Sequence, residues 1–241
     1  MKPQKIIPVA ILVIAAAIIL KTRAGKDFYY AGTVEATEVD IPARVSSVIA
    51  AFPAREGAAV KKAETLVVLA CEDIKIDAEN AESEYRRSLT LKANGSIGQE
   101  SFEKSKYRRD NAALKAGWCN ISSPINGTVL DTYYEPGEMV APGARLLTVA
   151  DLGEMWAYIY LPQPMIAKIT LNMPVKALMP EVPGKTIEGK ITHINDEADF
   201  TPKNVQTRKE RTRLVYGVKI TFKNAENILK PGMTIEAELP E

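Results

Sequence analysis

The chain is poor in the residue types that most often carry chemistry. Its 241 residues include two cysteines and one histidine, and aromatic residues make up 7%. Neither sign of charge dominates, because 31 basic residues stand against 30 acidic ones. Such a balance gives no general attraction to nucleic acid, and no basic patch interleaved with aromatic residues occurs. These shortages leave little for metal or nucleophilic chemistry and favour a structural or binding role.

No catalytic, cofactor-binding or metal-binding constellation is found among the polar residues that remain. The single histidine, His193, lies in a strand-like run and is interpreted as structural. The acidic group Asp196, Glu197 and Asp199 lacks the spacing and the glycine of a calcium-binding loop. The sequence therefore predicts a protein that is not an enzyme.

One uncharged run of 15 residues, Ile6 to Leu20, lies near the N-terminus. As a helix it would span about 22 Å, less than the roughly 30 Å hydrocarbon core, but flanking lysines can extend its reach. We predict a retained transmembrane helix within residues 1–27. A cleaved signal peptide is the alternative, although Lys21 and Arg23 interrupt the position of a cleavage site. A buried soluble helix is the third interpretation.

Two stretches of the chain repeat one pattern at a constant offset of 80 residues. Both consist of short β-branched runs broken by glycine and proline, which is typical of strands joined by tight turns. Gly57 and Gly137 are expected where a turn needs a positive φ or has no room for a Cβ atom. Half a sandwich cannot bury a face alone, so the copies should pack on each other. The matched pairs are Val45 and Ile125, Ser47 and Gly127, Ile49 and Val129, Gly57 and Gly137, Val60 and Val140, Leu66 and Leu146, and Leu69 and Val149.

Two helical segments separate the copies. Residues 73–93 and 99–116 are rich in helix formers, Asn94-Gly95-Ser96 breaks them, and Gly117 ends the second. We predict an antiparallel hairpin that folds back at Gly95. The pairs expected along its seam are Ile74 with Ala116, Ala78 with Ala112, Tyr85 with Ser105 and Ser88 with Phe102, flanked by Glu82 with Arg108 and Glu84 with Lys106.

Cys71 and Cys119 would lie opposite each other at the base of this hairpin. In an oxidising compartment they could form a disulfide, which would stabilise the chain by about 4 kcal/mol in the chain-entropy estimate. Two reduced, half-buried cysteines are the alternative.

Strand-like segments occupy the rest of the chain. Residues 28–44 read as a leading strand, and residues 152–241 read as about five strands, typical of a small antiparallel barrel. The polar connection from Asn195 to Thr212 exceeds the usual loop length and is a candidate functional surface. The predicted divisions are 1–27 (anchor), 28–44 (leading strand), 45–70 (first half), 71–120 (hairpin), 121–151 (second half) and 152–241 (barrel).

Three stretches, in this order, resemble the HlyD-like membrane-fusion or periplasmic adaptor family, especially its short-hairpin, ABC-transporter-associated branch. They are the split copies "VSSVIAAFPAREGAAV" and "SSPINGTVLDTYYEPGEMV", the turn "LTLKANGSIGQESFEKSK", and "DEADFTPKNVQTRKERTRLVYGVKI" followed by "LKPGM". The resemblance implies a mainly β fold with an α-helical hairpin. A biotinyl-lipoyl-like barrel-sandwich hybrid would be interrupted by an antiparallel coiled coil and followed by the barrel.

The resemblance also implies a function in efflux or secretion. The chain would be a single-pass protein of the bacterial inner membrane with its body in the periplasm. It would link an inner-membrane transporter, with an ABC permease and ATPase, to an outer-membrane exit duct and would associate with itself into a ring. A scaffold or regulatory subunit of a transporter without duct contact is the alternative, because arms of about 20 residues reach only about 30 Å.

Contact residues are implied by the same resemblance. At the hairpin tip Arg87 and Leu91 match the duct-docking pattern, and Gly95 lies in the turn. The third residue of that pattern is a serine, and Gly98 stands in its place. Ser96 or Ser101 could substitute for that serine. Ser47 and Ala63 replace two glycines of the first copy. The residues expected to contact the transporter are Thr201, Pro202, Lys203, Arg208, Arg211 and Arg213.

Overall fold

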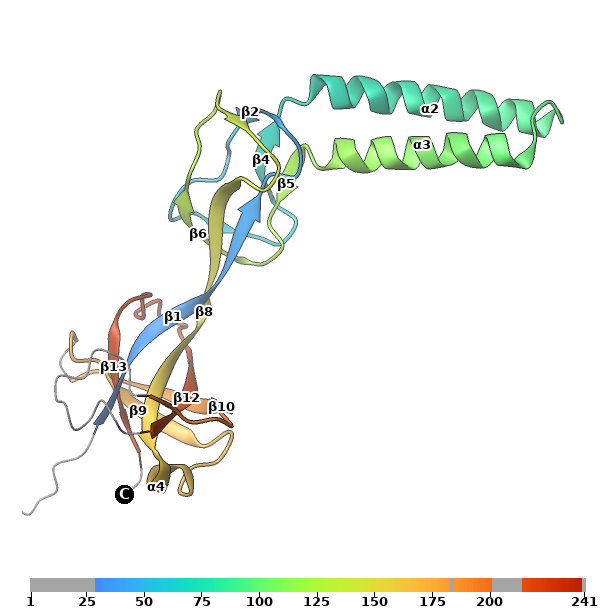
Figure 1. The fold of residues 1–241 in the computed structure, drawn as a ribbon. Helices are drawn as coiled ribbons and strands as arrows, with labels where there is room; N and C mark the ends of the chain where they lie inside the picture. The colour runs from blue at the N-terminus through green and yellow to red at the C-terminus, as the bar shows by residue number, and fades with distance from the viewer. Residues whose placement is uncertain (1–28, 183, 201–213, 240–241) are drawn as a thin grey trace, which may run out of the picture. The chain divides into compact units, whose positions relative to one another are not determined.

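The computed structural model describes residues 29–182, 184–200 and 214–239, and most of its elements are strands (Figure 1). The chain divides into two compact units. We call residues 36–155 with 224–230 the sandwich unit, and the described residues of 29–35, 156–223 and 231–239 the barrel unit. Two long strands, β1 (Tyr29–Pro42) and β8 (Arg145–Pro162), contribute residues to both units.

The sandwich unit is built from the strands of the two repeated copies. A four-stranded sheet has the order β5 (Asn120–Ser122), β4 (Thr65–Leu69), β2 (Ser47–Ala51) and β7 (Met139–Val140). Facing strands come from β6 (Gly127–Thr132), which pairs with β3 (Ala59–Val60) and with β8. The expected interruption by a hairpin is present, because α2 and α3 lie between β4 and β5.

The two copies exchange strands with each other, and the offset of 80 residues is kept in the pairing. Ser47 of the first copy lies opposite Val140 of the second, and Gly127 of the second lies opposite Val60 of the first. The turn glycines repeat this exchange. The Gly57 N–H donates to the Val129 carbonyl at 2.8 Å, and the Gly137 N–H donates to the Ile49 carbonyl at 2.9 Å. The prediction that the copies pack on each other is confirmed.

A single buried cluster lies between the copies, at positions related by the repeat. Ile49, Leu66 and Leu69 of the first copy and Val129, Leu146 and Val149 of the second are all at most 1% exposed. Full burial of such a side chain contributes about 1.5–3 kcal/mol. Neither copy has this core alone, so each copy depends on the other for its stability.

The hairpin consists of α2 (Glu72–Ala93) and α3 (Gln99–Gly117). Its turn is a Schellman motif in which Gly95 takes a φ of 69°. The Ser96 N–H donates to the Leu91 carbonyl at 2.8 Å and the Gly95 N–H donates to the Lys92 carbonyl at 2.9 Å. This motif is the physical reason for glycine at position 95, because a Cβ atom disfavours that left-handed backbone.

The register of the hairpin differs from the expected one. The rings of Tyr85 and Phe102 lie 5.7 Å apart, and Glu84 pairs with Arg108 at 2.8 Å. Glu82 instead pairs within α2, with Arg86 at 2.7 Å. The predicted pairs Glu82–Arg108 and Glu84–Lys106 are therefore wrong. The turn uses residues 94–98 and centres on Ser96 rather than Gly95, which moves α3 along α2.

The barrel unit contains a closed barrel of six strands. Its order is β12 (Leu214–Lys223), β10 (Thr186–Ile194), β9 (Pro174–Leu178), β13 (Thr234–Glu238), β1 and β8, and a β12–β8 pairing closes it. A short strand, β11 (Asp199–Phe200), adds to β12, and α4 (Gln163–Ile166) follows β8. The predicted antiparallel barrel is confirmed, with one of its strands provided by the beginning of β1.

Close packing explains two glycines of this barrel. A Cβ atom on Gly32 in β1 would lie 2.5 Å from the Tyr158 carbonyl oxygen of β8. A Cβ atom on Gly189 in β10 would lie 2.6 Å from the Phe222 ring, which is fully buried. Both glycines therefore make room for a neighbouring strand or ring.

Two predicted features lie outside the described residues: the transmembrane helix of residues 1–27 and the proposed contact segment from Thr201 to Arg213. Among the helices of the described ranges, which are α2, α3 and α4, none is long and apolar enough to cross a membrane.

Candidate functional site

The chain leaves the sandwich for the hairpin at Cys71, which has a left-handed backbone with a φ of 49°. Its N–H donates to the Ser47 hydroxyl at 2.9 Å, and its sulfur is bonded to that of Cys119. Both cysteines are 1% exposed, and their Cα atoms lie 6.2 Å apart. The disulfide joins the residue just before α2 to the residue just before β5, so it closes the base of the hairpin.

Ser47 and Gly127 occupy equivalent positions of the repeat but meet different neighbours. At Gly127 a Cβ atom would clash with the Ala150 carbonyl, where β8 continues straight. Residue 70, which matches Ala150 in the repeat, lies between the end of β4 and the start of α2. There the Ser47 hydroxyl accepts a hydrogen bond from the Cys71 N–H. The serine that departs from the repeat therefore helps to anchor the hairpin.

The hairpin seam is thin, and cations cover its aromatic rings. The Arg109 guanidinium lies 4.2 Å from the Tyr85 ring, and the Lys92 ammonium lies 4.0 Å from the Phe102 ring. Cation–π contacts at exposed sites contribute about 0.5–1 kcal/mol each. Ala81 is the buried residue of α2 and none of α3 is buried. The described helices of the hairpin therefore have almost no buried core of their own.

All four residues predicted at the tip are exposed. Arg87 and Leu91 are one turn apart on α2 and face the same way, and Leu91 is 44% exposed. Gly98 is the N-cap residue of α3, with ordinary backbone angles of −74° and 163°, and a Cβ atom added to it would meet no atom within 4 Å. Nothing in the fold therefore requires glycine at position 98, and a serine would fit.

A polar network that the sequence did not predict ties β1 to β8. The Thr148 hydroxyl donates to Asp40 at 2.8 Å, and Arg145 pairs with Asp40 at 3.2 Å. The Arg145 guanidinium also lies 4.2 Å from the Tyr133 ring. The hydrogen bond from Thr148, and then the charge and hydrogen bond of Arg145, lower the pKa of Asp40. The signal that could have revealed this network is the contrast between Val68 and Thr148 at matching repeat positions.

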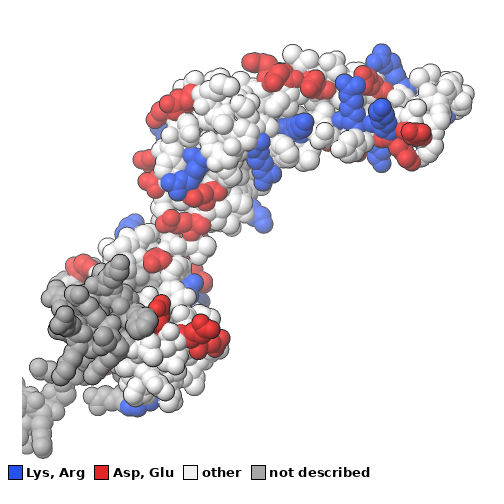
Figure 2. All heavy atoms as spheres, in the orientation of Figure 1, with Lys and Arg blue, Asp and Glu red and all other residues white. Residues whose placement is uncertain are grey.

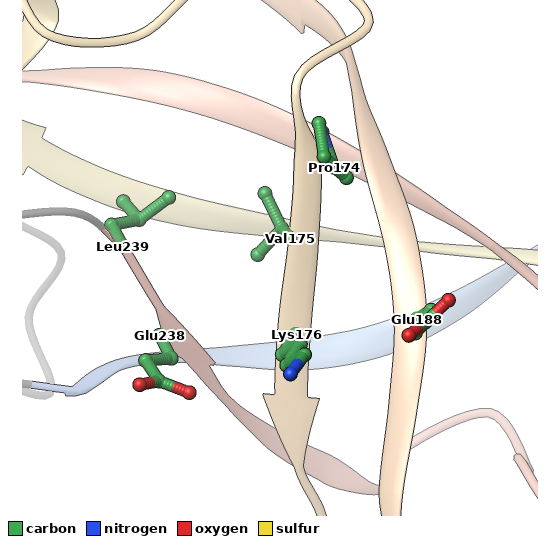
Figure 3. A pocket seen from close by; sticks show the side chains of 6 residues that line it. All are labelled: Pro174, Val175, Lys176, Glu188, Glu238 and Leu239. Carbon is green, nitrogen blue, oxygen red and sulfur yellow. The ribbon is translucent and has the colours of Figure 1, made fainter.

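The barrel unit has a hollow of about 460 Å³ on the surface of β9, β10 and β13 (Figure 3). Lys176 lies opposite Glu188 on one neighbouring strand and opposite Glu238 on the other. Such alternation of charge across strands stabilises a solvated sheet surface. Throughout the described ranges no three histidine, cysteine or acidic side chains come together as a metal site.

Family profiles match both units of the chain. Residues 37–151 match the CzcB-like barrel-sandwich hybrid domain, and residues 154–241 match the CusB-like beta-barrel domain. A UPF0194 membrane protein of Acidithiobacillus ferridurans is 36% identical over 161 residues, which are 64% of this chain and 48% of the relative. A UPF0194 membrane protein of Enterobacter sp. is 32% identical over 115 residues, 48% of this chain and 35% of the relative. The chain thus spans half or less of the length of these relatives.

Solved structures share the fold. A MacA-MexA chimeric protein with the α-hairpin domain of Pseudomonas aeruginosa MexA has a TM-score of 0.70 at 22% identity, covering 87% of this chain and 78% of the chimera. The membrane fusion protein Spr0693 of Streptococcus pneumoniae has a TM-score of 0.67 at 16% identity, covering 88% of this chain and 98% of its own. At these identities the likeness extends to the fold alone.

Proposed function

Because the chain belongs to the membrane fusion, or periplasmic adaptor, family, we propose that it couples an inner-membrane transporter to an outer-membrane exit duct. The transporter would be of the ABC type, with a permease and an ATPase. The protein would act without catalysis, by holding its partners at a fixed spacing. Several copies would form a ring through which substrates pass.

The observation that carries this proposal is the interrupted sandwich. The two copies bury one common core, and the hairpin leaves and rejoins it at Cys71 and Cys119, which belong to that core. The Cys71–Cys119 disulfide adds a covalent closure at the same place. A long polar element held in this way suits a rod that reaches a partner.

Membrane attachment and transporter contact are assigned to segments outside the described residues. Residues 1–27 would anchor the chain in the inner membrane as a single helix. Thr201, Pro202 and Lys203, with three nearby arginines, would contact the transporter. Because Arg208, Arg211 and Arg213 are basic, reversing Arg208 and Arg211 to glutamate should weaken co-purification of the transporter with the chain.

We assign duct docking to the exposed tip residues Arg87, Leu91, Gly95 and Gly98. Arg87→Glu tests this assignment, and Arg86→Glu is the matched control. The control makes the same change of charge one residue away, at an exposed side chain that pairs with Glu82 of the same helix. We expect Arg87→Glu to abolish export and cross-linking of the tip to the duct, while Arg86→Glu keeps both.

A specific observation favours the second candidate, a scaffold or regulatory subunit without duct contact. Gly98 stands where the duct-docking pattern has serine, and the helices of 22 and 19 residues are only about 33 Å and 28 Å long. If Arg87→Glu leaves export unchanged and no tip cross-link to a duct forms in the unaltered chain, the scaffold role replaces the adaptor role.

A further inference from the structure

A groove opens where the hairpin leaves the sandwich. It has a volume of about 500 Å³, and its lining comes from both helices, from the segment between β1 and β2 and from the turn before β8. Its least exposed side chains are apolar and form its floor: Val45, Ile74, Ala81, Ala112 and Trp118. The groove therefore offers an apolar surface at the base of the hairpin.

The groove is short, and its floor is held in place. Ile74 and Trp118 pack against the sandwich core, and the disulfide joins the residue before α2 to the residue after Trp118. Four residues beyond Ala81 the rings of Tyr85 and Phe102 occupy the seam, 5.7 Å apart. The open part is thus limited to the base of the hairpin. Its volume suits a small molecule, for which sites measure roughly 300–1,000 Å³, and a preformed site loses little freedom on binding.

Cations outnumber carboxylates among the exposed residues of the groove. Arg44, Arg108 and Lys115 line it together with one carboxylate, that of Asp77. Arg108 pairs with Glu84 at 2.8 Å, whereas no ion pair within the described residues involves Arg44 or Lys115. In Figure 2 acidic side chains lie along the upper edge of the hairpin, and basic side chains lie below it, near the junction with the sandwich. Two cations at the groove are therefore left for the charge of a ligand.

A second hollow, of about 370 Å³, adjoins the groove. The two share Arg44 and Trp118 as lining residues. The one carboxylate that lines the second hollow, Asp40, is already bonded to Thr148 and Arg145. Its apolar lining includes Val39, Ile41 and Ile121. Apolar surface thus continues past Arg44, which leaves room for a chain longer than the groove itself.

We propose that the groove binds an amphiphilic anion, a small molecule with an apolar chain and one anionic head group. The head group lies beside Arg44 and Lys115, and the chain lies on the floor in contact with Trp118. A cationic amphiphile meets the same floor but is repelled at the rim. This inference rests on the proposed function, because it names the class of compound that the export system moves.

Contact quenching of Trp118 tests the site. The full chain with Trp156→Phe, held in lipid nanodiscs, has Trp118 as its one tryptophan. We expect ω-bromoundecanoate to quench its fluorescence with saturation, because a bromine atom quenches an indole ring that it touches, and undecanoate to relieve the quenching. The shorter ω-bromohexanoate should bind several-fold more weakly, since it buries fewer methylene groups. A trimethylammonium probe with the same bromoundecyl chain should bind several-fold more weakly than the anion.

Charge variants locate the head group. Arg44→Gln with Lys115→Gln should weaken the binding of ω-bromoundecanoate several-fold. Arg55→Gln with Lys104→Gln makes the same change of charge outside the groove and should leave binding unchanged. All four side chains are exposed, so the fold should tolerate each change. Unchanged binding in the first variant, equal binding of the two undecyl probes, or a lack of saturable quenching would each overturn the proposal.

Failure of this inference can be told apart from failure of the proposed function. If ω-bromoundecanoate does not quench Trp118 while Arg87→Glu still abolishes export, the groove site fails and the adaptor role stands. If quenching depends on Arg44 and Lys115 but export continues in cells that lack the chain, the groove site stands and the adaptor role fails.

Discussion

Ala63 and Gly143 occupy the same position in the two copies, where one copy has alanine and the other has glycine. Both have a left-handed backbone, with φ angles of 68° and 87°. Both also make the same hydrogen bond across the copies: Ala63 to the Ser123 carbonyl at 2.7 Å, and Gly143 to the Ala43 carbonyl at 2.9 Å. Exchange of alanine and glycine at these sites therefore changes the backbone terms and leaves this hydrogen bond in place.

The size of the effect follows from two opposing terms. A left-handed backbone costs an alanine about 1–2 kcal/mol. A glycine loses more freedom on folding, which costs about 0.4–1 kcal/mol relative to alanine. No steric term is added, because a Cβ atom at Gly143 would have no neighbour within 4 Å. We expect Gly143→Ala to lower the free energy of unfolding by about 1 kcal/mol and Ala63→Gly to raise it by a similar amount.

The measurement is denaturant unfolding followed by Trp118 fluorescence in a Trp156→Phe background. Trp118 packs against the sandwich core, so its signal reports that unit. The combined variant should return close to the starting stability, because distant sites add. The strain argument fails if Ala63→Gly is destabilising, or if Gly143→Ala is neutral.

Three further changes have defined outcomes. Replacing Cys71 and Cys119 together by alanine should lower the free energy of unfolding by up to about 4 kcal/mol, since they close a loop of 48 residues, and reductant should have the same effect on the unaltered chain alone. The lowered pKa of Asp40 means that its contribution to stability is present above about pH 4 and is lost as the pH falls through the folded-state pKa. Asp40→Asn should flatten the acid limb of a stability-against-pH curve, and an unchanged limb would contradict the assignment. Gly95→Ala should cost about 1 kcal/mol locally and speed amide exchange at Ser96, which donates to α2, without changing exchange in the sandwich core.

The sandwich could be predicted because its signal is local and is present twice. Short β-branched runs, turn glycines and a constant offset together define strands that must pair across copies. In the structure β2 and β6 begin 80 residues apart, as do β3 with β7 and β4 with β8. The base of the hairpin could also be predicted, because the two cysteines mark where the chain leaves and re-enters the sandwich.

Features set by tertiary context were harder to predict. The hairpin register depends on how many residues the turn uses, and the Schellman motif at Gly95 moved the salt bridge of Glu84 to Arg108. The barrel takes a strand from β1, which local pattern assigned to a separate leading segment. The hydrogen bond from Thr148 to Asp40 joins residues 108 positions apart, and the sequence around either residue does not predict it.

The strand exchange between the copies also determines when this chain can fold during its synthesis. β2 and β3 pair with β7 and β6, whose residues follow 80 positions or nearly so later in the chain, so the first copy stays incomplete while about 80 more residues leave the ribosome. At about 5–20 residues per second that interval lasts about 4–16 seconds. The intervening helices form within microseconds and bring the two copies together. A nascent chain halted inside the hairpin would therefore lack β7, the outer partner of β2, and β5, the outer partner of β4, and would expose those strand edges to chaperones and proteases.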